Sequence, residues 1–140
     1  MTDSWQIGAV TVTRVEEAVT PVPAEALIPS FEASMLEAHP WLQPRWFDDE
    51  GLLKLSVHTF VVQSGDTTVV VDTCVGTEPE RALPGDPAFL DRLGAAVDGG
   101  IDGVDVVLCT HLHFDHVGWN TIGRDGERVA SFPNARYLFG

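Results

Sequence analysis

Hydrophobic and polar positions alternate along several stretches of this chain, as they do in half-buried strands. Residues 5–15 are rich in β-branched side chains and predict a strand. Residues 53–62 place leucine and valine on one face and polar side chains on the other. The turn residues 64–66 and the apolar run 67–71 then predict the returning strand of a hairpin. The unbroken valines from Val69 to Val71 predict that this strand is buried on both faces.

Two other stretches show the spacing of amphipathic helices. Residues 30–38 predict a short helix, and residues 86–97 predict a longer one. The longer helix begins at Asp86, which can cap it, and ends before Gly99. Its apolar stripe consists of Phe89, Leu90, Leu93 and Val97.

The second half of the chain continues with a buried strand over 104–109, a polar turn at 124–128 and a further strand over 135–139. Strands that alternate with a helix are typical of the α/β class. Open α/β sheets bind ligands at the carboxyl ends of their strands. We therefore expect the functional residues among those that follow 104–109.

Those residues concentrate metal-binding side chains in a single short motif. The string Thr-His-Leu-His-Phe-Asp-His, residues 110–116, contains the candidate metal ligands His111, His113, Asp115 and His116. Imidazole suits zinc and neighbouring transition metals, and the carboxylate adds a hard, negatively charged oxygen. The sequence therefore predicts a metal site.

The spacing of the four side chains favours two adjacent ions over one. Because the side-chain period of a strand is two, His111 and His113 point the same way and can share one ion. Asp115 and His116 follow where the backbone turns, and they can reach a second ion. A pair of metals about 3.5–4 Å apart would activate a water as hydroxide near neutral pH and polarise a substrate oxygen. Asp115 is also the candidate catalytic residue, since it can orient that water.

The motif His111-x-His113-x-Asp115-His116-x-Gly118 resembles the signature of the metallo-β-lactamase superfamily. The longer string over 110–120 and the segment 132–137 are similar to its lactonase-like hydrolase branch. The resemblance implies an αββα sandwich in the α/β (α+β) class. It further implies that His111 and His113 bind the first metal, and that Asp115 and His116 bind the second.

The strand that ends in Val71-Asp72-Thr73 also resembles a strand of that superfamily, which ends in an aspartate near the metals. The resemblance implies that Asp72 hydrogen-bonds beside a metal ligand. The alternative is a plain turn residue at the end of the strand, and the sequence weighs the two equally. Trp119 and Asn120 also have two alternative roles, which the sequence weighs equally: they line the substrate pocket, or they pack at the start of the next segment. Gly118 is expected to permit a close approach of the backbone.

The chain departs from the superfamily pattern after His116. The remaining metal ligands of that family, two histidines and an aspartate, lie farther downstream, and no histidine follows His116 here. The sequence also ends at Phe139-Gly140, in or just after an apolar strand. We therefore expect residues 1–140 to form a single partial domain, the amino-terminal half of the sandwich, which needs its carboxyl-terminal half or a partner copy.

Composition limits the partners. The formal net charge of −13 disfavours nucleic acid, because such a field repels phosphate. The chain has no apolar run long enough to cross a bilayer, and the first residues lack the pattern of a secretory signal. Its two cysteines, Cys74 and Cys109, predict buried thiols in a cytoplasmic protein. A small molecule is the expected substrate.

The sequence therefore predicts a metal-dependent hydrolase that cleaves an ester, lactone or related acyl bond through a metal-bound hydroxide. Two Zn²⁺ or other divalent transition metals are the expected cofactors. Two alternatives stay open. One is an iron-dependent thiol or persulfide oxidoreductase of the same fold, because the motif alone does not select the metal. The other is a truncated metal-binding product without catalytic activity.

Overall fold

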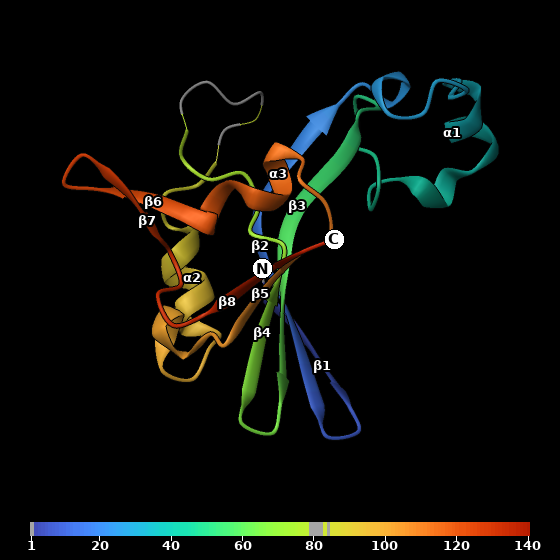
Figure 1. Cartoon of the computed structure of the whole chain (residues 1–140). Helices are drawn as coiled ribbons and strands as arrows, with labels where there is room; N and C mark the ends of the chain where they lie inside the picture. Colours follow the sequence, from blue (N-terminus) through green and yellow to red (C-terminus); the bar gives the residue numbers. More distant parts are fainter. Residues whose placement is uncertain (1, 79–82, 84) are drawn as a thin grey trace. The chain divides into compact units, whose positions relative to one another are not determined.

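The computed structural model describes residues 2–78, 83 and 85–140, whose strands form a six-stranded and a two-stranded sheet (Figure 1). The order across the larger sheet is β1-β2-β3-β4-β5-β8. Its strands are β1 (Thr2–Ile7), β2 (Val10–Val22), β3 (Leu53–Ser64), β4 (Thr67–Val71), β5 (Val106–Cys109) and β8 (Arg136–Phe139). The smaller sheet is the antiparallel hairpin of β6 (Thr121–Arg124) and β7 (Glu127–Ala130).

The helices are short. They are α1 (Ser34–Ala38), α2 (Phe89–Ala95) and α3 (Phe114–Val117), with 3-10 turns at Ala24–Ala26, Pro40–Leu42, Gly100–Gly103 and Gly118–Asn120. No helix in the part of the chain that the structure describes is long and apolar enough to span a membrane.

Two parallel pairings form the part of the sheet that positions the candidate site. β4 pairs in parallel with β5, and β5 pairs in parallel with β8. The register places Val71 opposite Leu108. The carboxyl ends of β4 and β5 therefore lie at the same edge of the sheet, and the residues that follow them are neighbours.

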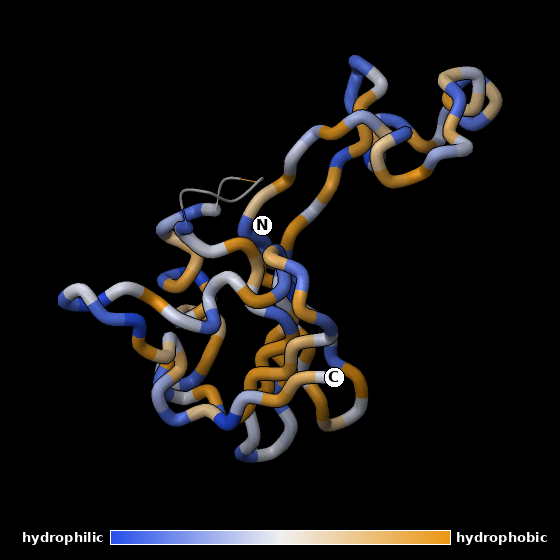
Figure 2. Tube along the Cα trace, turned by 45° about the horizontal axis from the view of Figure 1, so that its top comes forward, coloured by the Kyte–Doolittle hydropathy of each residue, from blue (hydrophilic) through white to orange (hydrophobic). Residues whose placement is uncertain are grey.

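The core lies between α2 and one face of this sheet. Phe89 and Leu93 of α2 are fully buried against valines that include Val70 and Val107. In Figure 2 the hydrophobic segments gather where the strands of the larger sheet run together, whereas the tip of the β6–β7 hairpin is hydrophilic. The apolar stripe predicted for this helix is thus confirmed.

The prediction that β4 is buried on both faces is wrong. Thr68 and Val70 are buried, but Val69 and Val71 are only half-buried. In β5, likewise, Val107 and Cys109 are buried whereas Leu108 is 37% exposed. The helix covers one face of the strands, so their side chains alternate between the core and an exposed apolar face.

Other predicted elements differ in their bounds. Residues 5–15 form no single strand, because the chain reverses at Gly8, whose φ of 61° suits glycine, and β1 and β2 pair as a hairpin. The helix predicted to begin at Asp86 begins at Phe89 instead. Asp86 lies in the preceding turn, where its carboxylate accepts a hydrogen bond from the Ala88 amide at 2.9 Å. The expected turn at 124–128 is the tip of the β6–β7 hairpin.

The chain forms two compact units, one from residues 1–18 and 57–140 and the other from residues 19–56. Within the smaller unit, Phe31 stacks on Phe47 with ring centroids 5.2 Å apart. The Asp48 carboxylate accepts hydrogen bonds from the amides of Glu50 and Leu52. The predicted metal ligands all belong to the larger unit.

Candidate metal centre

The ends of β4 and β5 bring Asp72 next to the histidine motif. The Asp72 amide donates to the Leu108 carbonyl at 2.8 Å, continuing the ladder between the two strands by one residue. The backbone then turns at Asp72, whose φ is 60°. This turn directs its carboxylate to Thr110, whose amide donates to Oδ1 at 2.8 Å.

His111 and His113 form the first pair of predicted ligands. The Nε2 atom of His111 lies 3.0 Å from the Nδ1 atom of His113, and both residues are exposed. Two nitrogens that bind one tetrahedral zinc at about 2.0–2.1 Å are about 3.3 Å apart. The observed separation therefore suits two donors to one ion.

Asp115 and His116 form the second pair. The Nε2 atom of His116 lies 3.6 Å from Oδ2 of Asp115, again close to the span of two donors to one ion. The rings of His111 and His116 have centroids 3.9 Å apart, so the two pairs lie side by side. This grouping corresponds to the predicted pair of adjacent ions.

The hydrogen bonds around the two pairs select the ring tautomers. The single Thr110 hydroxyl proton is directed to the acceptor-only carboxylate of Asp72, whose oxygens lie at 2.8 and 3.0 Å. The Thr110 oxygen, 3.1 Å from Nδ1 of His111, then accepts from that nitrogen. Nδ1 of His116 likewise donates to Oδ2 of Asp72 at 2.8 Å. In both rings the Nε2 lone pair is left for a metal.

The donor set fits divalent transition metals, but it is shared between two positions. Among residues 2–78, 83 and 85–140, no group of three or more His, Cys, Asp or Glu side chains could hold an ion. The geometry explains this result, because each predicted ion would receive two ligands from these residues, not three. The assignment of His111, His113, Asp115 and His116 as metal ligands stays a prediction.

A family model described as the metallo-beta-lactamase superfamily matches residues 52–138. The chain belongs to the metallo-beta-lactamase superfamily. The resemblance that the histidine motif suggested is thereby confirmed. No curated protein matches the chain significantly.

Solved structures with the metallo-beta-lactamase fold cover almost all of this chain. The hydrolase AbOPH of the beta-lactamase superfamily is 27% identical with a TM-score of 0.68, and the match covers 97% of this chain and 43% of that one. AidC, a dizinc quorum-quenching lactonase, is 16% identical with a TM-score of 0.71 and the same coverage. A probable metal-dependent hydrolase from Staphylococcus aureus is 18% identical with a TM-score of 0.69, covering 95% of this chain and 47% of that one.

These similarities establish the fold. The identities of 16% and 18% show the fold alone. The chain spans less than half the length of each of these structures, so the predicted partial sandwich is confirmed at the level of the fold. Members of the superfamily generally bind divalent metals, and two of these neighbours are described as hydrolases.

The residues that follow the superfamily motif pack into the protein. Trp119 is buried, with its ring stacked on Phe89 at a centroid distance of 6.1 Å. Asn120 contacts the Thr73 hydroxyl at 2.9 Å and the Cys109 sulfur, inside the same region. Of the two alternatives for Trp119 and Asn120, the structure therefore shows packing.

Both cysteines are buried, and neither forms a disulfide. Burial raises the pKa of the Cys74 thiol, and it also raises the pKa of the Cys109 thiol. Both therefore stay protonated at neutral pH, which makes them poor metal ligands. The interpretation of Cys74 and Cys109 as structural thiols agrees with this geometry.

Asp72 is held as an ionised acceptor. Burial raises the pKa of its carboxyl group, but hydrogen bonds from the Thr110 amide, from His116 and from the Thr110 hydroxyl outweigh burial. The net result is a pKa below the ordinary value of 3.8. Sequence reasoning found Asp72 and missed Thr110, although a hydroxyl directly before the first histidine was a signal for a hydrogen-bonding partner.

We expect Asp72→Asn to weaken zinc binding by about 10- to 100-fold, the usual effect of removing the partner of a ligating histidine. Asparagine tolerates the left-handed backbone of this position, but its amide replaces one acceptor oxygen and its side chain carries no charge. Zinc affinity is measured by competition with a chromophoric chelator. The matched control is Asp66→Asn in the exposed turn between β3 and β4, which should bind zinc as the parent does. Equal affinity of Asp72→Asn and the parent would contradict this role.

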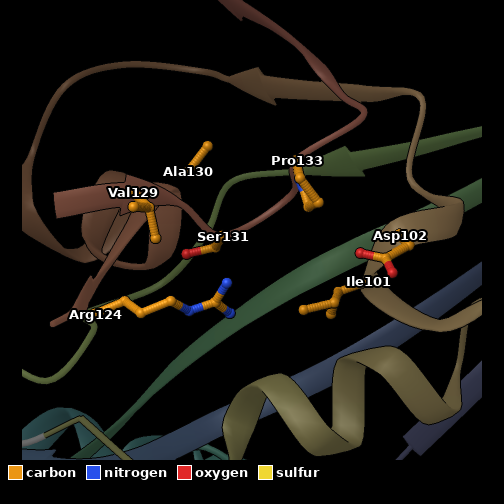
Figure 3. A pocket seen from close by; sticks show the side chains of 7 residues that line it. All are labelled: Ile101, Asp102, Arg124, Val129, Ala130, Ser131 and Pro133. Carbon is orange, nitrogen blue, oxygen red and sulfur yellow. The ribbon is translucent and has the colours of Figure 1, made fainter. Parts of the chain in front are cut away.

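A separate pocket of about 400 Å³ lies beside the β6–β7 hairpin (Figure 3). Arg124 extends toward Ile101 across it. The residues that line it are Ile101, Asp102, Arg124, Val129, Ala130, Ser131 and Pro133. This lining contains no predicted metal ligand, so the pocket is not part of the candidate metal centre.

Proposed function

We propose that this chain carries part of the dinuclear zinc centre of a hydrolase that cleaves an ester, lactone or related acyl bond in a small molecule. The observation that carries the proposal is the arrangement of His111, His113, Asp115 and His116 as two donor pairs side by side. The superfamily assignment and the hydrolase neighbours support it at a coarser level.

The chain's own residues would bind the two ions, hold the histidine tautomers and orient the attacking water. His111 and His113 bind one ion, while Asp115 and His116 bind the other, with the histidine tautomers held by Thr110 and Asp72. A pair of divalent ions supplies a nucleophilic water at neutral pH and polarises the carbonyl oxygen under attack.

The Asp115 carboxylate would also accept a hydrogen bond from the attacking water and orient it toward the carbonyl carbon. His111 and His113 are exposed, so a substrate can approach the ions from solvent. The net charge of −13 makes the ions the local source of positive charge for an anionic product.

The test combines metal analysis with a substrate panel. We expect zinc in the purified protein, and hydrolysis of at least one member of a panel of acyl lactones, esters and thioesters that stops when a chelator removes the metal. A second panel of thiols and persulfides is tested for oxygen consumption. Iron content with oxygen uptake, or an absence of zinc binding, would contradict the proposal.

A further inference from the structure

Glu17 is a buried acid that the metal scheme does not use. It lies on β2, and only 6% of its surface is exposed. Its Oε2 atom accepts a hydrogen bond from the Val75 amide at 2.7 Å. Its Oε1 atom accepts two more, from the Asp86 amide at 3.2 Å and from Nε1 of Trp119 at 2.6 Å.

These three donors come from three separate segments. Val75 belongs to the loop after β4, Asp86 precedes α2, and Trp119 follows the histidine motif. The segments approach one another so closely that side chains do not fit. A Cβ atom on Gly118 would lie 1.8 Å from the Val75 carbonyl oxygen, and one on Gly85 would lie 1.8 Å from the Gly76 oxygen.

The loop that Glu17 holds is hydrogen-bonded directly to the backbone of His116 and of the two residues Gly118 and Trp119 that follow it. The Thr73 amide donates to the His116 carbonyl at 2.8 Å, and the Trp119 amide donates to the Thr73 carbonyl at 2.9 Å. The Gly118 amide donates to the Cys74 carbonyl at 2.7 Å. A displacement of the loop at Val75 therefore moves the support of His116.

We infer that Glu17 is a positioning residue of the metal centre, which sets the place of the Asp115–His116 pair by clamping the loop after β4 to Trp119. The inference rests on the proposed function, because it assumes that this pair binds an ion. Glu17 itself touches none of the predicted ligands in the hydrogen bonds described above.

The chemistry of the clamp requires a carboxylate. All three partners are N–H donors, and an ionised carboxylate is an acceptor at both oxygens. Glutamine has nearly the same shape, but its NH₂ group would face an N–H at one of the two positions. One buried donor would then lose its partner, which costs more than the hydrogen bond itself.

The experiment compares Zn²⁺ affinity in the purified chain and its Glu17→Gln variant by competition with a chromophoric chelator. We expect about 10-fold weaker binding in the variant, at the lower end for partners outside the ligand shell, with an unchanged far-ultraviolet circular dichroism spectrum. With Co²⁺ in place of Zn²⁺, the visible absorption of the bound ion should change in intensity, because the ligand geometry has changed.

The matched control separates positioning from stability. Val15 lies two residues earlier on the same strand and is 1% exposed, but it makes no side-chain hydrogen bond to the loop. Val15→Ala should lower the melting temperature and keep the Zn²⁺ affinity and Co²⁺ spectrum of the parent. If Glu17→Gln does not fold, Trp119→Phe removes one donor and keeps an aromatic side chain, and it should bind Zn²⁺ about 3-fold more weakly, the scale of one lost hydrogen bond.

Three outcomes would overturn the inference. The first is parental Zn²⁺ affinity in Glu17→Gln or, where that variant does not fold, in Trp119→Phe. The second is an equal loss of affinity in Val15→Ala, which would assign the effect to general destabilisation. These two leave the proposed function intact, whereas the third, a parent chain that binds no Zn²⁺, overturns both.

Discussion

Replacing His113 with alanine should lower Zn²⁺ affinity by more than about 100-fold, beyond the effect expected for a partner outside the ligand shell. His113 supplies one of the two nitrogens that face each other 3.0 Å apart at the first predicted ion position. Without it, His111 alone remains there, and any hydrolysis by the parent protein should be lost with the metal. Zinc content and chelator competition measure the change.

The matched control for His113→Ala is its neighbour Leu112. This side chain is 64% exposed and lies between the two histidines, but it has no donor atom. Leu112→Ala should therefore retain the zinc content of the parent protein. A His113→Ala variant that binds zinc as tightly as Leu112→Ala would remove His113 from the site.

Replacing Gly118 with alanine should destabilise the protein by about 3 kcal/mol or more, the upper range for overpacking. The added Cβ would lie 1.8 Å from the Val75 carbonyl oxygen and 2.5 Å from the Gly76 nitrogen, and backbone atoms cannot rotate away as side chains do. For a chain of this size, we expect the melting temperature to fall by roughly 10 °C. Thermal unfolding followed by circular dichroism gives this shift.

The matched control for Gly118→Ala lies in β6. A Cβ atom on Gly123 would meet no heavy atom within 4 Å, so Gly123→Ala should leave the melting temperature almost unchanged. The comparison separates a loss of space from a general effect of glycine substitution. Equal melting temperatures for the two variants would contradict the close approach between Gly118 and the loop after β4.

The elements that sequence patterns predicted well are those with local causes. The strand over 53–62, its returning partner over 67–71 and the apolar stripe of α2 follow from side-chain periodicity alone. The prediction of one strand over 5–15 was wrong. The segment is rich in β-branched residues, and this composition gave no sign that the chain reverses at Gly8. The prediction that β4 is buried on both faces was wrong, because side-chain periodicity does not reveal how many layers of structure cover a strand.

The candidate site shows the same division. The short motif over 110–116 predicted the four metal ligands. The resemblance to the metallo-β-lactamase superfamily added Asp72, which lies at the end of another strand. Glu17 was missed, although a signal existed. It continues the inward-facing positions of Thr13 and Val15 along β2, where an acid needs buried partners. Nothing local identifies those partners, since Trp119 is 102 residues away along the chain.

The sequence by itself determined the superfamily and the α/β class, and it predicted which residues could bind metal, because these depend on residue type and short spacing. Only the tertiary structure decided the ring tautomers of His111 and His116, the contact of Asp72 with Thr110 and the clamp at Glu17. The parallel pairing of β4 with β5 brings Asp72 to Thr110, and β2 carries Glu17 to three further segments. Contacts between residues so distant in sequence arise when the core forms around α2, and no local pattern encodes them.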